Sequence, residues 1–437
     1  MSQLKKKLNI YGLTMIAVGA CIGSGIFSSP GQVAAAVPNH TLVLAVWALG
    51  GVIALTGALT FSELGAMFPK AGGVYVYLKE AYGEMTGFLY GWVILLVINS
   101  GALAALAITF ADYMTYFIVM TDQVKVVLAA VTIIFLTGIN AVGINMSQIF
   151  ANLFSTLKLI AIAGIILAGF VFYNAEKVPL DFTMASAPEN IFNAMLVGLI
   201  GVLWSMGGWH HASYLSEEAI DAKRTVPRAM ILGVLIVTVM YVLVNLAYMM
   251  LLPLPDIAAS SRVAGDAVGQ VVSFGGKLVA VIIAISIFGT IGIYTMSAPR
   301  VYFAMAKDGV FFKGLSKIHP TYGTPVNAML VQAIWAIVLL LFWGAFEELI
   351  SYVTFMDIIF MTMAGISIFI FRNKRPAAER PIKALGYPII PIIFILISTA
   401  FVISTFFEKW EQAIGGLIVL GLGLPVYYYF KSQKERT

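Results

Sequence analysis

Charged residues and cysteines are scarce in this sequence. Asp, Glu, Lys and Arg make up 11% of the 437 residues, whereas hydrophobic residues make up 60%. Soluble globular domains carry about 25% charged residues. The scarcity of charge, together with a mean hydropathy of +0.95, therefore excludes a soluble enzyme, a disordered regulator and a nucleic-acid-binding protein. The one cysteine, Cys21, excludes an intrachain disulfide framework. This composition indicates an integral membrane protein.

The sequence also lacks the short motifs that carry common enzyme chemistry. It contains no G-x-S-x-G nucleophile elbow, no H-E-x-x-H zinc motif and no Walker A sequence. His210 and His211 precede Glu217 and Glu218, but adjacent histidines do not share one helix face. A polar inner gate or a loop contact is therefore favoured over a metal site. We expect no enzyme activity, no metal, no cofactor and no ATP-driven step, so a membrane enzyme is the weakest alternative.

Long apolar runs are what the sequence has in abundance. A membrane-spanning helix needs about 20 apolar residues and a barrel strand about 10, so runs such as 231–252 exclude a barrel. No short apolar core followed by an A-x-A-like site begins the chain, so we expect no cleavable signal peptide. The runs predict one all-α transporter domain, 1–437, with twelve transmembrane helices at 9–37, 41–67, 84–119, 124–141, 147–173, 190–216, 227–252, 272–306, 325–345, 348–372, 387–407 and 411–431.

The basic residues are distributed unevenly between the segments that join these helices. With the N-terminus placed in the cytoplasm, 20 of the 26 Lys and Arg residues fall on the cytoplasmic side and five on the outer side. Cytoplasmic segments of membrane proteins carry an excess of Lys and Arg. The pattern predicts a multi-pass protein of the plasma membrane with both termini in the cytoplasm. The remaining basic residue, Lys158, lies inside the fifth predicted helix.

Two of the predicted helices contain glycine interruptions near the middle of the bilayer. The first has Gly23-Ser24-Gly25-Ile26-Phe27, and the sixth has Trp204-Ser205-Met206-Gly207-Gly208-Trp209. Close packing of small residues between helices is one reading of either motif. Unwound backbone at this depth is tolerated where protein buries it or where it lines a cavity. Because paired interruptions in matching positions mark the binding site of many transporters, we predict that helices 1 and 6 are broken there.

Broken helices expose charged ends to the cavity between them. The N–H groups around Ser24, Gly25 and Ile26 carry the positive end of a helix dipole, which suits a carboxylate. The carbonyl groups near Cys21 and Trp204 carry the negative end, which suits an ammonium group. A site that binds both ends of a zwitterion predicts a free amino acid as substrate.

Four motifs follow one another along the chain in a characteristic order and spacing. They are Gly23-Ser24-Gly25-Ile26-Phe27 with Pro30-Gly31; Pro69-Lys70-Ala71-Gly72-Gly73-Val74-Tyr75-Val76-Tyr77 with Gly83, Gly87-Phe88 and Gly91-Trp92; Gly207-Gly208-Trp209 with Glu217-Glu218, Arg224, Pro227 and Arg228; and Arg300 through Ala306-Lys307-Asp308-Gly309 to His319-Pro320 and Thr324-Pro325. In these motifs the chain resembles the amino acid–polyamine–organocation superfamily. Within that superfamily it resembles the L-type amino acid transporter family, in particular bacterial alanine/serine/cysteine-type exchangers.

The resemblance implies a fold and an activity. It implies two inverted five-helix repeats, at about 9–173 and 190–372, followed by two accessory helices at about 387–431. It also implies sodium-independent exchange of small neutral L-amino acids, such as alanine, serine or cysteine, by alternating access. The residues that it places around the substrate are Cys21, Ser24, Gly25, Ile26, Trp204, Ser205 and Gly207. Many relatives have Asp or Asn where this chain has His210.

Lys158 is the buried charge with the clearest functional interpretation. A cation inside a membrane helix is costly and marks a functional site by default. In the resembled fold this lysine lies where sodium-coupled relatives bind their ion. Its ammonium group is predicted to hold the carbonyls of the Gly23–Gly25 break and to bond hydroxyls of Thr290 and Tyr294. The alternative is a lysine that extends to the cytoplasmic interface.

The other charges inside the predicted helices receive simpler interpretations. Asp357 is left open as a proton carrier, a substrate-facing group or a helix-capping partner. Glu63 is predicted to pair with loop cations such as Lys70, and Asp112 to reach the outer interface. The cluster of basic residues at 372–383 is read as a topology signal, with lipid headgroup binding as the second reading.

Several alternative functions and one partner remain to be weighed. A proton-coupled amino acid symporter, an exchanger of cationic amino acids or polyamines, and a non-transporting amino acid sensor are the alternatives. Animal members of the resembled family attach to a heavy chain through a cysteine in the loop after helix 3. Because Thr121–Lys125 contains none, we expect no disulfide-linked heavy chain. The expected partners are small neutral amino acids and the lipid bilayer, and no nucleic acid.

Overall fold

The computed structural model describes residues 4–342, 346–408 and 410–435, and these residues form helices joined by loops without a β-sheet. The α-helices are α1 Ile10–Cys21, α2 Gly25–Ala36, α3 His40–Met67, α4 Val74–Tyr82, α5 Glu84–Val93, α6 Asn99–Met114, α7 Asp122–Ala141, α8 Ile144–Phe172, α9 Ile191–Ser205, α10 His211–Tyr214, α11 Ala222–Leu251, α12 Leu254–Ala259, α13 Val263–Gly269, α14 Gly275–Ser297, α15 Pro299–Lys307, α16 Val326–Phe342, α17 Phe346–Lys374, α18 Ile389–Glu408 and α19 Trp410–Glu435. A π-helix, η1 Ile94–Ile98, and two 3-10 helices, η2 Ser216–Glu218 and η3 Lys313–Ser316, complete the described elements.

Each of the twelve predicted spans coincides with helix in the structure, and the all-α membrane class is confirmed. Among the described residues, nine helices are long and apolar enough to cross a bilayer, and a tenth span is the pair α1 and α2, bent by 47°. The other two, α9 and α16, are shorter apolar helices. The 15 residues of α9 extend about 22 Å, short of a hydrocarbon core of about 30 Å. The count of twelve crossings therefore stays a prediction.

Helices outside the predicted spans were not anticipated from the sequence. The nine residues of α4 lie between the second and third spans, and α12 and α13 lie between the seventh and eighth. Each is shorter than a membrane span, so the search for apolar runs did not detect it. The π-helix η1 interrupts the third span, and such interruptions occur frequently at functional sites.

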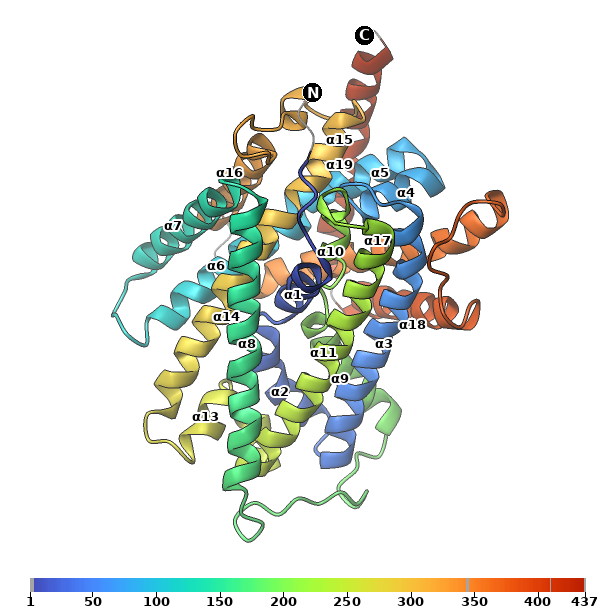
Figure 1. The fold of residues 1–437 in the computed structure, drawn as a ribbon. Coiled ribbons are helices and arrows are strands. Elements are labelled where there is room, and N and C mark those ends of the chain that lie inside the picture. The colour runs from blue at the N-terminus through green and yellow to red at the C-terminus, as the bar shows by residue number, and fades with distance from the viewer. Residues whose placement is uncertain (1–3, 343–345, 409, 436–437) are drawn as a thin grey trace.

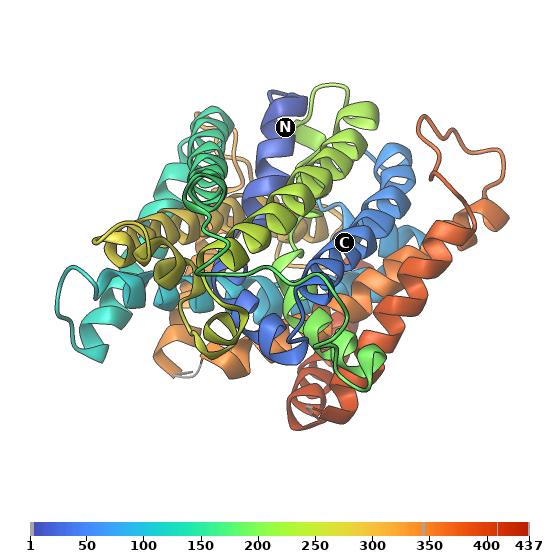
Figure 2. The ribbon, with the colours of Figure 1, turned by 90° about the horizontal axis from the view of Figure 1, so that it is seen from below.

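The two halves of the first span lie at the centre of the bundle. Helix α1 packs against α11, α8 and α14, whereas α2 packs against α9 and α12. Figure 1 shows both ends of the chain at one end of the molecule, which we call the terminal end. Figure 2 shows the opposite end, which the connection 173–190 crosses. That connection is held by Asn39, whose Nδ2 donates to the Thr183 carbonyl at 2.7 Å.

An ion pair and a tyrosine hydroxyl join α4 to the end of α15 at the terminal end. Lys79 Nζ lies 2.8 Å from Asp308 Oδ2, and Tyr75 Oη donates to the same oxygen at 2.7 Å. Burial and the neighbouring Asp308 carboxylate raise the pKa of the Tyr75 phenol above its ordinary value, so the phenol stays protonated and remains a donor. These contacts fix α4 against the end of α15.

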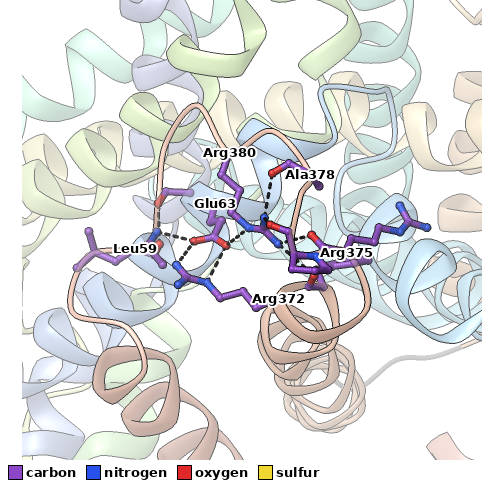
Figure 3. Close-up of polar contacts among 10 residues, drawn as sticks. Leu59, Glu63, Arg372, Arg375, Ala378 and Arg380 are labelled. Atoms are coloured by element: carbon purple, nitrogen blue, oxygen red, sulfur yellow. Dashed lines mark hydrogen bonds and ion pairs between the residues drawn. The ribbon is translucent and has the colours of Figure 1, made fainter.

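Glu63 pairs with two arginines and not with Lys70. One of them, Arg380, lies in a loop, so the prediction of a loop cation is confirmed and the named residue was wrong. Figure 3 shows its buried carboxylate between Arg372 and Arg380. Arg372 Nη2 lies 2.6 Å from Oε2 and Arg380 Nε lies 3.0 Å from Oε1. The loop after α17 folds back over the end of α3, and the Ala384 N–H also donates to Glu63. Two residues of the basic cluster at 372–383 thus have a structural role that the topology reading did not include.

We expect Glu63→Gln to destabilise the protein by about 1–3 kcal/mol, because it removes the charge that Arg380 faces in a buried position. The measurement is the midpoint of thermal unfolding in detergent. The matched control is Glu80→Gln, since Glu80 pairs with Arg375 at the exposed surface, where an ion pair contributes about 0–1 kcal/mol. Equal shifts for the two variants would contradict a structural role for Glu63.

Candidate functional site

A cavity of about 120 Å³ lies where the two interrupted spans meet. Its wall comes from α1, α2, η1, α6, α9, α10, α14 and α17 and from the segments that join α1 to α2 and α9 to α10. Of the ten residues that the sequence analysis assigned to substrate binding or coupling, eight line this cavity: Cys21, Ser24, Gly25, Trp204, Ser205, Gly207, Thr290 and Tyr294. Ile26 and Lys158 do not, because Ile26 is fully buried beside the wall and Lys158 lies behind it.

The first span breaks at the glycines, as the sequence predicted. Helix α1 ends at Cys21, and α2 begins at Gly25. Helix geometry leaves the N–H groups of Gly25 and Ile26 without an acceptor inside α2, and Ser24 caps this helix without a side-chain bond. The negative end of α1 and the positive end of α2 therefore both face the cavity, and only residues 22–24 separate the two helices.

The sixth span breaks at the second glycine interruption, residues 204–209, and this break packs directly on the break in the first span. Helix α9 ends at Ser205, and the short helix α10 begins at His211. A Cβ atom on Gly25 would lie 2.6 Å from Ser205 Oγ, so only glycine allows this approach. Gly208 has φ +103°, and a Cβ atom there would lie 2.7 Å from the Ala20 carbonyl oxygen. Two glycines of the predicted motifs thus permit the close contact of the interruptions.

Lys158 is buried and its ammonium group is fully satisfied. The residue is 2% exposed, and Nζ donates to Gly19 O at 2.8 Å, Ile22 O at 2.7 Å and Thr290 Oγ1 at 2.7 Å. Three hydrogens therefore meet three acceptors. The alternative of a lysine extending to the interface is wrong in this conformation. The predicted bond to Thr290 is present, but the carbonyls held are those of Gly19, one turn before Gly23, and of Ile22, directly before it.

Tyr294 does not hold Lys158, and the prediction of that contact was wrong. In the described part of the chain, its carbonyl accepts from Asn99 Nδ2 at 3.4 Å and from Gln332 Nε2 at 3.2 Å. Its ring stacks on His211 with centroids 4.2 Å apart. One turn of helix separates Tyr294 from Thr290, so only the earlier hydroxyl reaches the ammonium group.

The polar residues that follow the second glycine interruption have separate contacts. They are His210, His211, Glu217 and Glu218. His211 Nδ1 lies 2.6 Å from Ser297 Oγ, and His210 lines the cavity. Glu217 pairs with Lys307, whereas Glu218 forms a fully buried pair with Arg300 at 2.8 Å. Within residues 4–342, 346–408 and 410–435, no group of three or more His, Cys, Asp or Glu side chains is arranged to hold a metal ion. Loop contacts are thus present for Glu217 and Glu218, whereas the polar inner gate stays a prediction.

Sequence reasoning missed two side chains that hold the interruptions. Tyr241 Oη, from α11, lies 3.1 Å from the Cys21 carbonyl oxygen and 3.2 Å from that of Ser205, so one hydroxyl bridges the ends of both broken helices. Ser286 Oγ donates to the Ile22 carbonyl at 3.1 Å. The signal available in the sequence was a hydroxyl-bearing side chain inside each apolar run, but this signal did not indicate which neighbour the hydroxyl would face.

Comparison with known proteins agrees with this architecture. Residues 8–423 match the amino acid permease family. The chain is 33% identical to the serine/threonine exchanger SteT of Bacillus subtilis over 99% of this chain and 98% of that protein. It is 31% identical to mouse b(0,+)-type amino acid transporter 1, over 99% of this chain and 89% of that protein. It is 32% identical to mouse large neutral amino acids transporter small subunit 2, over 97% and 81% respectively. The chain therefore belongs to the amino acid permease family of the amino acid–polyamine–organocation superfamily, and it is a multi-pass membrane transporter of amino acids.

Proposed function

We propose that this transporter exchanges small neutral L-amino acids across the plasma membrane without sodium, by alternating access. The observation that carries the proposal is the 120 Å³ cavity enclosed by the ends of two broken helices. Its volume suits a short side chain, and its position places a substrate between opposite helix ends. The relatedness to a serine/threonine exchanger supports a small substrate.

The helix ends supply recognition of the amino acid backbone. The substrate carboxylate binds at the N–H groups of Ser24, Gly25 and Ile26, where the positive end of α2 lies. The ammonium group binds at the carbonyl ends of α1 and α9, near Cys21 and Trp204. Ser205 and Gly207 complete the wall beside the backbone. Trp204, which is partly exposed in the cavity wall, covers the bound substrate as a gate.

A fixed cation at the first break supports sodium independence. Lys158 Nζ contacts two carbonyl oxygens and the Thr290 hydroxyl, and oxygen atoms of this kind are the ligands that a metal cation would require. Because the ammonium group already neutralises these oxygens, the break is stabilised with no sodium bound. Lys158 and Thr290 couple the state of α1 to that of α14, while Tyr294 contributes to the cavity wall.

Uptake of labelled serine into proteoliposomes in sodium-free buffer tests the substrate class. We expect saturable uptake that excess alanine, serine or cysteine inhibits strongly and that excess arginine or a polyamine leaves nearly unchanged. Replacing external potassium with sodium is expected to have no effect on the initial rate. Uptake that requires sodium, or that cationic amino acids inhibit best, would contradict the proposal. Binding of serine without any flux would indicate a sensor.

The membrane orientation and the absence of a covalent partner form part of the proposal. The 20-to-five distribution of basic residues and the common position of both chain ends in Figure 1 support cytoplasmic termini. The only cysteine, Cys21, is 6% exposed within α1, where a partner's thiol does not reach it. We expect the protein to migrate as an uncrosslinked chain on non-reducing gels of native membranes, and a covalent complex that reduction releases would contradict this.

A further inference from the structure

Asp357 is a residue of the cavity wall whose Oδ1 atom has no hydrogen-bond partner among the described residues. It lies near the middle of α17 and borders both the 120 Å³ cavity and an adjoining cavity of about 90 Å³. Its Oδ1 atom is buried, and the described part of the chain offers it no hydrogen bond. The residue as a whole is partly exposed, so a molecule in either cavity can contact the exposed part of Asp357.

Other buried carboxylates of the described chain are satisfied. Glu218 faces Arg300, and Glu63 faces Arg372 and Arg380. Buried polar groups are generally hydrogen-bonded, and an exception requires an explanation such as a ligand. Asp357 thus differs from the structural carboxylates Glu218 and Glu63. Their oxygens have protein partners, whereas its Oδ1 atom has none among the described residues.

Two polar side chains of the cavity wall, Tyr214 and His211, are hydrogen-bonded to residues outside that wall. Tyr214 Oη lies 2.5 Å from Tyr90 Oη, and His211 is held by Ser297. None of these groups donates to Asp357. An acceptor left free among satisfied neighbours can receive a donor from a bound molecule without disrupting the wall.

We propose that Asp357 selects substrates that carry a hydroxyl group on the side chain, with its carboxyl group accepting the hydrogen bond of that hydroxyl. This inference rests on the proposed function. A hydroxyl has one hydrogen and matches one free acceptor, whereas an ammonium group has three donors and a guanidinium five. The wall of the adjoining cavity is largely apolar, with Ile53, Met361, Phe394 and Phe401 among its residues, and besides Asp357 only His210 and Ser398 bring a side-chain nitrogen or oxygen acceptor to it. The carbonyl oxygen of a carboxyl group accepts whether or not the other oxygen is protonated.

Isosteric substrate pairs test the hydroxyl preference in proteoliposomes. Serine is compared with 2-aminobutyrate, and threonine with valine, as competitors of labelled serine uptake. For the unmodified protein we expect the hydroxylated member of each pair to inhibit at roughly 10- to 100-fold lower concentration. In Asp357→Leu the ratio within each pair is expected to fall to about one, and in Asp357→Asn, which keeps a neutral acceptor, to an intermediate value.

A matched control and three outcomes decide the test. Thr362→Val lies on the same helix, and its hydroxyl is satisfied by the Ile358 carbonyl, so its ratio is expected to equal that of the unmodified protein. Equal inhibition within each pair for the unmodified protein, or an unchanged ratio in Asp357→Leu or Asp357→Asn, would overturn the proposal. Strong inhibition by lysine that is lost in Asp357→Asn would also overturn it, in favour of a cation partner. If the unmodified protein takes up no neutral amino acid, the proposed function itself fails.

Discussion

Exchange by Lys158→Ala is expected to fall about 100-fold or more relative to the unmodified protein. The variant removes a buried cation that donates to Gly19 O, Ile22 O and Thr290 Oγ1, and among the described residues the carbonyls of Gly19 and Ile22 then keep only the hydroxyls of Thr290 and Ser286 as side-chain donors. Each lost bond to the ammonium group costs up to about 3 kcal/mol, and tenfold in rate corresponds to about 1.4 kcal/mol. The measurement is the initial rate of exchange in proteoliposomes that contain equal amounts of protein.

Two further variants separate the coupling role of Lys158 from a general effect on folding. Lys158→Met keeps most of the length of the side chain and removes the ammonium group with its charge and its three donors, and it is expected to lose exchange to a similar extent. Lys277→Met removes an exposed lysine near the start of α14 and is expected to exchange at the normal rate. Full activity of a monodisperse Lys158→Ala preparation would refute a role for this residue in transport.

The second large effect concerns the pair between Glu218 and Arg300. Both side chains are fully buried, and Arg300 Nε lies 2.8 Å from Glu218 Oε2 while Nη2 lies 2.8 Å from Oε1. Glu218→Leu leaves the guanidinium group buried without its counter-charge, which destabilises a protein by about 3–5 kcal/mol. We therefore expect a large fall in the midpoint of thermal unfolding in detergent. The pair fastens the segment after α10 to α15 at the terminal end of the molecule.

A neighbouring ion pair provides the control for this prediction. Glu217 directly precedes Glu218, and its partner Lys307 lies on α15, as Arg300 does. In contrast to the buried pair, Lys307 is 59% exposed. Lys307→Met is expected to change stability by about 0–1 kcal/mol. The double variant Glu218→Leu with Arg300→Met removes both charges and is expected to recover most of the loss. A double variant no more stable than Glu218→Leu alone would show that packing, and not charge, explains the effect.

The interruptions and the buried lysine could be predicted because their signals are local. Glycines at 23 and 25 inside an apolar run weaken one helix wherever that helix is placed. Lys158 stands out because a charge in a membrane helix has few structural explanations. The bond from Lys158 to Thr290 followed from the resemblance, which supplies the proximity of the fifth and eighth spans.

The remaining contacts depend on which residues the fold brings together. Glu63 and Arg372 are 309 residues apart in the sequence, and the nearer Lys70 was the simpler but incorrect partner. Tyr241 bridges two helix ends from within an apolar run, where nothing local indicates that its hydroxyl faces the interruptions. The register of Tyr294 on α14 differs from that of Thr290 by one turn, and this difference decides which hydroxyl reaches Lys158.

Counterflow in proteoliposomes tests the central claim most directly. Vesicles loaded with unlabelled serine, or with no amino acid, are placed in sodium-free buffer with labelled serine and a proton ionophore. An exchanger that works without sodium is predicted to take up label rapidly into the loaded vesicles and hardly at all into the empty ones. Uptake that needs no internal amino acid and collapses with the ionophore would contradict exchange and would identify a proton-coupled symporter.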